Sequence, residues 1–272
     1  MMMTGLCYID GIDIYAEYGV FIEGDGYNEL LSFPALKEPE KNDWPEEHGI
    51  EIDLSEPRLQ AREVTITFAG GVWQTFYSFL AKEGYRVVHV PGLGRSWTLR
   101  VLEMARLENY SCVDLFSVKF IEDDTDIPTG YPSASADVGL VCEVSSDGKT
   151  LDKYGIIITS GLDDLERSPK MKRSLTRSFA FQNGQLYDDD HVRYAEKEVT
   201  LGCCLIAPQI AVFWDLHDAL FGDLLKPGSR KISYKGKEYD AFYRKTGNWR
   251  LHAHAGEVIC EFDLTICIIK EL

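Results

Sequence analysis

The hydrophobic residues of this chain fall mostly into short extended runs separated by turn residues. In the last such run, "VICEFDLTICII" (258–269), every second residue from Val258 to Ile268 is apolar. The stretch "CVDLFSVKFIE" (112–122) alternates in the same way. Because successive side chains of a strand point to opposite faces, this pattern predicts strands with one buried face.

Two stretches change from a period of two to the spacing of a helix. "FYSFLAKEG" (76–84) and "FWDLHDALFG" (213–222) repeat large apolar residues three or four positions apart and close on a glycine. Glycine is common directly after the last helical residue. The pattern predicts one amphipathic helix in each half of the chain, ending at Gly84 and at Gly222.

Asp-Gly pairs mark a turn near the start of each half. Asp10-Gly11 and Asp147-Gly148 stand between short extended segments, and each is followed by Tyr-Gly and an apolar run, "YGVFI" or "YGIIIT". A type I′ turn needs a positive φ at both central residues, which Asp-Gly accepts. We therefore predict a hairpin and then a strand at both places.

An internal repeat relates the two halves. The stretch "GIEIDLSEPRLQAREVTI" (49–66) aligns without a gap with "GQLYDDDHVRYAEKEVTL" (184–201). The identical positions pair Gly49 with Gly184, Asp53 with Asp188, Arg58 with Arg193, and Glu63-Val64-Thr65 with Glu198-Val199-Thr200. The order hairpin, strand, polar arm, strand, helix and final strands is therefore predicted twice.

A long polar arm lies inside each repeat, at about residues 24–57 and 160–192. The first arm contains the acidic run "EPEKNDWPEEHGIEID" (38–53), whereas the second contains "RSPKMKRSLTR" (167–177), with five basic residues and no acid. Their proline, glycine and charge content predicts a long hairpin outside the core. The two arms are opposite in charge.

These elements predict a mostly β protein with one helix per domain, built from two tandem antiparallel β-sandwich or barrel domains. The first domain would span residues 1–122 and the second residues 138–272. The acidic, proline-containing stretch 123–137 would be the linker between them.

The charge of the chain argues against one class of partner. The net charge is −16, of which residues 1–136 carry −13 and residues 137–272 carry −3. Such acidity would repel phosphates, so we do not expect a protein that binds nucleic acid tightly.

No apolar run approaches the length of roughly 20 residues that a membrane-spanning helix needs, and the N-terminus has no basic region, so we expect neither a membrane span nor a signal peptide. Seven cysteines, two of them adjacent at Cys203-Cys204, indicate reduced thiols in a cytoplasmic protein.

The sequence offers little that could carry catalysis. His252 and His254 in "LHAHA" share one face of a predicted strand and are weak candidates for a metal site, although two surface histidines are the commoner arrangement. The acidic clusters at 123–126 and 187–191 lack the spacing of a calcium loop. "PGLGRS" (91–96) has neither a phosphate-loop nor a dinucleotide-binding spacing. We therefore expect neither an enzyme nor a bound cofactor.

In both halves the order of features resembles the tail-tube domain of long-tailed bacteriophages, as in the distal tail protein family. The likeness is carried by "DGIDIYAEYGV" with "HGIEIDLSEPRLQAREVTITF" in the first half, and by "DGKTLDKYGI" with "NGQLYDDDHVRYAEKEVTL" in the second. It implies a non-enzymatic ring protein of the virion tail, made in the bacterial cytoplasm, that joins the tail tube to baseplate or receptor-binding proteins. DNA would pass through the ring without specific binding, and an acidic lumen suits this passage.

Two such domains in one chain resemble the baseplate hub, in which a trimer of two-domain subunits forms a pseudo-sixfold ring. A hexamer is the other ring that the resemblance allows. In either case the arms would carry most contacts between subunits, with acidic and basic arms pairing, and the C-terminal strands would form the tube wall. The residues predicted for the interface are Trp44 and Arg58 in the first arm, and Arg173 and Arg193 in the second.

The alternative comes from a different class, a cytoplasmic β-protein that binds a small ligand or a carbohydrate. Trp44, Trp73 and Trp249 would then be exposed platforms on which the ligand stacks. Such a protein would be a monomer or dimer with a concave aromatic pocket, whereas the ring protein would self-associate.

Overall fold

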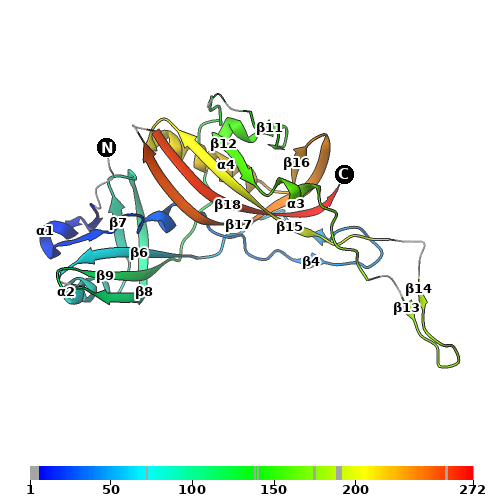
Figure 1. The fold of residues 1–272 in the computed structure, drawn as a ribbon, viewed down its shortest axis with the longest axis horizontal. Helices are drawn as coiled ribbons and strands as arrows, with labels where there is room; N and C mark the ends of the chain where they lie inside the picture. The colour runs from blue at the N-terminus through cyan, green and yellow to red at the C-terminus, as the bar shows by residue number, and fades with distance from the viewer. Residues whose placement is uncertain are drawn as a thin grey trace.

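The computed structural model describes residues 6–71, 73–137, 139, 141–173, 176–187, 192–254 and 257–271. Within these residues the protein has two seven-stranded antiparallel sheets, each packed with helices, and two small two-stranded sheets (Figure 1). The predicted fold class, mostly β and antiparallel, is confirmed. No helix among the described residues is long and apolar enough to cross a membrane.

In the first half, residues 1–122, the large sheet has the strand order β2-β1-β7-β8-β9-β6-β3. Its elements are β1 (Tyr8–Ile9), β2 (Ile12–Asp13), α1 (Ile14–Tyr18), β3 (Val20–Ile22), the 3-10 helix η1 (Asn28–Leu31), β4 (Lys41–Asn42), β5 (Glu51–Ile52), β6 (Arg62–Gly70), α2 (Trp73–Leu80), β7 (Arg86–Val90), β8 (Arg95–Asn109) and β9 (Asp114–Glu122).

In the second half, residues 138–272, the order is β11-β10-β16-β17-β18-β15-β12. The elements are β10 (Ser145–Ser146), β11 (Lys149–Thr150), the 3-10 helix η2 (Leu151–Tyr154), β12 (Ile156–Ser160), α3 (Leu162–Glu166), β13 (Thr176–Arg177), β14 (Leu186–Tyr187), β15 (Lys197–Ala207), α4 (Ile210–Leu224), β16 (Arg230–Tyr234), β17 (Lys237–His254) and β18 (Glu257–Glu271). Replacing each strand by its counterpart converts the first order into the second, so the sequence repeat is a repeat of topology.

The repeat extends to single hydrogen bonds at the base of each arm. Two backbone bonds bracket an isolated bridge in the first arm, and two bonds of the same length bracket a bridge at the equivalent place in the second arm. The pairs are Gln60 N–H to Ala35 O and Ala195 N–H to Lys170 O, then Lys37 N–H to Arg58 O and Lys172 N–H to Arg193 O, all at 2.8 Å. The bridges are Leu36 with Leu59 and Met171 with Tyr194. Both arms therefore leave their sheets with the same backbone geometry.

The Asp-Gly hairpins have the predicted turn. Asp10 and Asp147 have φ of 52° and 50°, and the glycine after each has φ of 79°. Each aspartate also accepts a hydrogen bond from the backbone of the neighbouring strand, from Val87 N–H at 2.9 Å and from Lys231 N–H at 2.8 Å. The turn residue is thus selected both by its backbone freedom and by its side chain.

A cation ties each arm to its sheet, buried in the first half and half-buried in the second. Arg62, at the start of β6, donates to the carbonyl groups of Leu30 and Ser32. Lys197, the counterpart at the start of β15, donates to the equivalent carbonyl groups of the second half, those of Leu165 and Arg167. These carbonyl groups lie at the C-terminal ends of η1 and α3. They have no hydrogen-bond partner within such short helices. A cation at this position therefore fixes where the arm begins.

Each half has one helix of at least eight residues, α2 or α4, but neither ends at the predicted glycine. α2 ends at Leu80, where the guanidinium of Arg86 donates to the carbonyls of Leu80 and Lys82 and caps the last turn. α4 continues past Gly222 to Leu224. A Cβ at Gly222 would lie 2.0 Å from the Tyr131 ring, so this glycine serves close packing within the helix.

The final strand is buried more completely than its alternation predicts. The predicted inward residues, every second one from Val258 to Ile268, are buried, but so are Thr265, Cys267 and Ile269. The first arm passes here, with Gly49 against the carbonyl of Ile269, so the outer face of β18 is covered too.

Replacing Arg62 by Met should lower the free energy of unfolding by about 3 kcal/mol, because Glu122, which it pairs with at 2.7 Å, would keep a largely buried charge without a partner. Urea denaturation measures the loss. Arg62→Met combined with Glu122→Gln should recover part of it, since no charge is left behind. Equal losses in the single and double variants would contradict this account.

Candidate interaction surfaces

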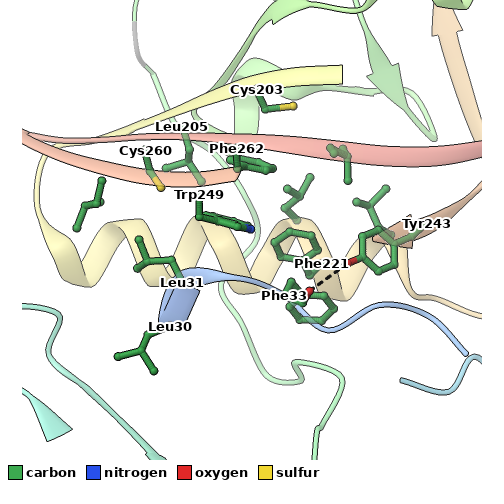
Figure 2. Packing of buried hydrophobic residues seen from close by; sticks show 14 of the residues in the cluster. Leu30, Leu31, Phe33, Cys203, Leu205, Phe221, Tyr243, Trp249, Cys260 and Phe262 are labelled. Atoms are coloured by element: carbon green, nitrogen blue, oxygen red, sulfur yellow. Dashed lines mark hydrogen bonds between the residues drawn. The ribbon is translucent and has the colours of Figure 1, made fainter. Parts of the chain in front are cut away.

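The two halves are joined by a segment of the first half that packs into the core of the second. We call residues 28–36, which comprise η1 and the chain after it, the first docking segment. Figure 2 shows Leu31 and Phe33 of this segment beside α4, whereas Leu30 points away from that helix. The Phe33 ring stacks on Phe221 of α4, with ring centroids 4.1 Å apart and planes 2° from parallel. Phe33 thus extends the second hydrophobic core with an aromatic ring from the first half.

The same segment lies along an edge of β17. Leu36 N–H donates to the carbonyl of Arg244 at 2.9 Å. The Thr246 hydroxyl accepts a hydrogen bond from Phe33 N–H and donates one to the Phe33 carbonyl, each at 3.2 Å. The Tyr243 hydroxyl donates to the carbonyl of Pro34 at 2.9 Å. Two backbone groups on the open side of β17, the Arg244 carbonyl and Leu251 N–H, thus find partners in the first docking segment, and β17 side chains bond backbone groups of that segment.

A second connection places charged groups between the halves. Arg95 at the start of β8 makes a bidentate contact with Asp218 of α4, at 3.2 and 3.1 Å. The Arg95 guanidinium also lies 4.4 Å from the centre of the Trp214 ring, and Trp214 Nε1 donates to the Leu93 carbonyl at 2.7 Å. Arginine can make a bidentate contact with a carboxylate while its guanidinium stacks on an aromatic ring, and lysine at position 95 would lose both interactions.

His217 lies buried beside this pair. Its Nδ1 is 2.9 Å from Asp218 Oδ1 and its Nε2 is 3.3 Å from the Leu31 carbonyl. Burial lowers the pKa of His217, so the ring is neutral at pH 7. Burial alone would raise the pKa of Asp218, but the hydrogen bonds from His217 and Arg95 outweigh it and lower that pKa. The contact thus holds one carboxylate, one guanidinium and one neutral imidazole.

A cavity of about 240 Å³ opens at this junction. It is lined by side chains from both halves and from the connecting stretch 123–137, among them Arg62, Arg95, Asp124, Trp214 and Asp218. The two arginines of the lining are in ion pairs, Arg62 with Glu122 and Arg95 with Asp218, and Asp124 and Asp126 add further negative charge. The cavity is therefore explained by the packing of two halves around ion pairs.

The two arms pair with each other inside the chain. Lys172 of the second arm is buried at its side chain, forms an ion pair with Asp43, and donates to the Trp44 carbonyl at 2.8 Å. Tyr194 stacks on His48, with ring centroids 5.7 Å apart. The opposite charges of the arms are thus used within one chain, and β13 and β14 extend beyond this contact (Figure 1).

The four residues predicted for an interface lie on the arms but do not form one cluster. Trp44 is 47% exposed and donates to Glu51 at 3.0 Å, while Arg58 is exposed and pairs with Glu56 at 2.6 Å. Arg193 donates to the Glu46 carbonyl at 2.7 Å, which places it in the contact between the arms. Arg173 is exposed. Their role between subunits stays a prediction.

Phe33 and the first docking segment were missed from the sequence. The available signal was the apolar run "LLSFPAL" (30–36) inside a segment otherwise rich in charge. An apolar run in a polar arm indicates that part of the arm is covered.

The described residues contain no group of three or more side chains that could hold a metal ion. His252 is exposed and lies 3.9 Å from Glu261, and the side chain of His254 lies outside the described part of the chain, as does most of the cluster 187–191. Asp123 of the other acidic cluster pairs with Arg100 at 2.9 Å.

Two of the three tryptophans predicted as ligand platforms are not freely exposed. Trp249 is buried and stacks on Phe262 at 4.3 Å, because it belongs to the second core, and Trp73 is half-buried. The adjacent cysteines of β15 differ in burial, with Cys203 buried and Cys204 half-buried, because successive side chains of a strand point to opposite faces. Burial raises the pKa of the Cys203 thiol, which disfavours the reactive thiolate.

No family model matches the chain, and no curated protein matches its sequence significantly. Among solved structures, the fold is similar to that of the Dit protein of phage SPP1, described as a paradigm of the hub adsorption apparatus in phages that infect Gram-positive bacteria. The match covers 98% of both chains, with 9% sequence identity and a TM-score of 0.33. At this TM-score the likeness carries no conclusion about the role of the chain.

Gly49 and its repeat counterpart Gly184 provide a matched pair of substitutions. Both have positive φ, 68° and 81°, but a Cβ at Gly49 would lie 1.9 Å from the Ile269 carbonyl, whereas none of the atoms described comes within 4 Å at Gly184. Gly184→Ala should cost about 1 kcal/mol for the left-handed backbone. Gly49→Ala should cost about 2 kcal/mol more, because the first arm must move off β18. Chemical denaturation of both variants checks the order, and equal costs would exclude the close approach.

The neutral, buried state of His217 predicts acid sensitivity. Because its pKa is lowered in the folded protein, its contribution to stability is present above the unfolded value of about 6.5 and is lost as the pH falls. The free energy of unfolding, measured by denaturation at pH 7.5 and at pH 5.5, should fall by roughly 1 kcal/mol per pH unit below pH 6.5. His217→Gln should flatten this slope, whereas His252→Gln, at an exposed position, should leave it unchanged. An unchanged slope in His217→Gln would assign the acid sensitivity to other groups.

Proposed function

We propose that this protein is a non-catalytic structural component of a phage or prophage tail, a distal tail or baseplate hub ring that connects the tail tube to the tip. Its two halves would occupy alternate positions of the ring, as a trimer with pseudo-sixfold symmetry or as a hexamer. Other tail or baseplate proteins would bind its two rims. DNA would pass through its lumen without specific binding, and the protein would reside in the virion tail.

The observation that carries this proposal is the duplication of one fold unit within one chain. Both sheets have the same strand order, and both arms leave them through the same hydrogen bonds. A duplicated unit with a projecting arm can tile a closed ring when neighbouring units make equivalent contacts. The first half already makes such a contact with the second, through the first docking segment and β17.

Charge and chemistry support the same proposal. The net charge of −16 suits a channel that must not retain DNA. The cysteines of the two cores are buried, and the described residues hold no metal-ligating cluster, so the features that the structure does offer are surfaces for assembly.

The proposal is tested by the assembly state of the purified chain. Negative-stain electron microscopy and mass photometry over a range of protein concentrations should reveal rings with three-fold or six-fold symmetry and a central opening. The expected masses are multiples of the 30.8 kDa chain, three or six. A chain that stays monomeric at every concentration, with no ring in any image, would contradict the proposal and favour the ligand-binding alternative.

A further inference from the structure

One edge in the first half lacks the cover that its counterpart has in the second half. β17 pairs with β16 only over Lys237–Ala241, and beyond that point its free edge is covered by the first docking segment. β8 pairs with β7 only over Arg95–Leu99. From Arg100 to Asn109 the strand pairs with β9 on one side, and no strand of the described chain pairs with its other side.

The equivalence of the two edges can be fixed residue by residue. Val64 of β6 and Val199 of β15 are repeat counterparts, and they pair with Phe120 and Ile266. Phe120 and Ile266 pair in turn with Val101 of β8 and Tyr243 of β17. Both strands then have a bulge that leaves one residue unpaired, Leu102 in β8 and Arg244 in β17. Leu102 is therefore the counterpart of Arg244.

The partner of this edge also has a counterpart. The first docking segment, residues 28–36, corresponds to residues 163–171, which we call the second docking segment. Pro34 corresponds to Pro169, and Leu36 corresponds to Met171. Because the same two hydrogen bonds bracket Leu36 and Met171, the Met171 N–H points to the side from which Leu36 N–H reaches the Arg244 carbonyl.

Leu36 and Met171 differ in exposure, which is expected if the first docking segment is bound within the chain and the second docking segment is unbound. Leu36 is 4% exposed, whereas Met171 is 71% exposed. On the opposite side Leu102 is 39% exposed. Met171 thus stands exposed at the position of the buried Leu36, and the apolar Leu102 stands at the position of Arg244. Joining the two side chains would remove both from water.

The charges beside the two contacts differ in sign, but the Glu38–Arg244 ion pair does not itself recur, because Leu102 stands at the position of Arg244. In the covered contact, acidic Glu38 pairs with Arg244 at 2.5 Å, next to Lys245. The counterpart of Glu38 is Arg173, and the counterpart of Lys245 is Glu103. The second contact would therefore set a basic segment against an acidic edge. Glu63 lies on β6, two strands away from this edge, and pairs with Lys119 of β9 at 3.1 Å, so Glu103 is the acid that β8 itself presents beside Leu102.

We propose that the second docking segment of one copy binds the β8 edge at Leu102 and Glu103 of another copy, head to tail. The contact repeats the backbone part of the one that joins the halves within a chain, with Met171 N–H donating to the Leu102 carbonyl, whereas Ser168 stands at the position of Phe33. Each copy then offers one free segment and one free edge, so the contact is heterologous and closes into a ring when its rotation allows. This inference rests on the self-association in the proposed function and names the surface that makes it.

The inverted charges also set the order of the halves. If the first arm of another copy met the β8 edge, Glu38 would face Glu103, and like charges across an interface disfavour that pairing. The sign of the charges therefore selects an alternation of first and second halves along the assembly.

Cross-linking between two variant chains tests the contact directly. Both chains carry Cys112→Ser, which removes the exposed thiol. One also carries Met171→Cys and the other Leu102→Cys, and the two are mixed in equal amounts with a short bismaleimide. A covalent dimer should form in the mixture and not in either variant alone, because each new thiol needs the other. Leu107→Cys in place of Leu102→Cys is the matched control, since it is 38% exposed on the same strand but about 16 Å farther along it.

Charge exchange provides a second measurement. Arg173→Glu and Glu103→Lys should each weaken self-association, measured by sedimentation velocity, by about five- to tenfold, because an attraction becomes a repulsion. The two substitutions in one chain should restore it, since the pair is then present with its signs exchanged. Both residues are exposed, and circular dichroism verifies that the variants are folded.

The outcomes separate this contact from the proposed function. Rings that form without a Met171–Leu102 cross-link, or with an equal cross-link to Leu107, overturn the contact and leave the ring intact. Cross-linked open chains without closed rings keep the contact and contradict the ring. A chain that neither associates nor cross-links overturns both.

Discussion

The packing of Phe33 against Phe221 of α4 and Tyr243 of β17 is the interaction on which the arrangement of the two halves depends. Its ring is stacked on Phe221, and the chain around it covers the open side of β17. There Leu36 N–H donates to the Arg244 carbonyl, and Phe33 N–H donates to Thr246 Oγ1. Removing that segment would expose an aromatic core and a row of backbone groups together. The bidentate ion pair of Arg95 with Asp218 adds a directional contact, but the apolar packing of Phe33 fixes the position of the two halves.

Duplication has preserved the backbone and changed the chemistry on it. The arms begin with the same hydrogen bonds, and a cation holds the same carbonyl groups in both halves, as Arg62 in one and Lys197 in the other. The positions that differ are those facing a neighbour. Gly49 permits close packing on β18, whereas Gly184 stands at the end of a projecting hairpin. The first half thus supplies the arm that packs on the second half, whereas the second half both receives that arm and bears the projecting hairpin.

The elements set by short-range patterns were predictable from the sequence. The Asp-Gly hairpins and the alternating strands were placed correctly, because turn geometry and the two-residue period depend on neighbours in the chain. The helix ends were not, since Gly222 was taken for a helix end although it packs against Tyr131, far away in sequence. The burial of Trp249 was missed for the same reason, because it depends on Phe262 of β18 and on His217 and Phe221 of α4.

The sequence by itself determined that the chain contains one fold unit twice, that the unit is antiparallel β with a helix and an arm, and that the arms are opposite in charge. Only the tertiary structure decided that the arms meet within one chain, that Phe33 belongs to the core of the other half, and that one strand edge is covered while its counterpart is open. The physical reason is that local patterns specify each element, whereas the partner of a polar arm or a strand edge is chosen by long-range packing, which leaves only an apolar run such as "LLSFPAL" as its trace in the sequence.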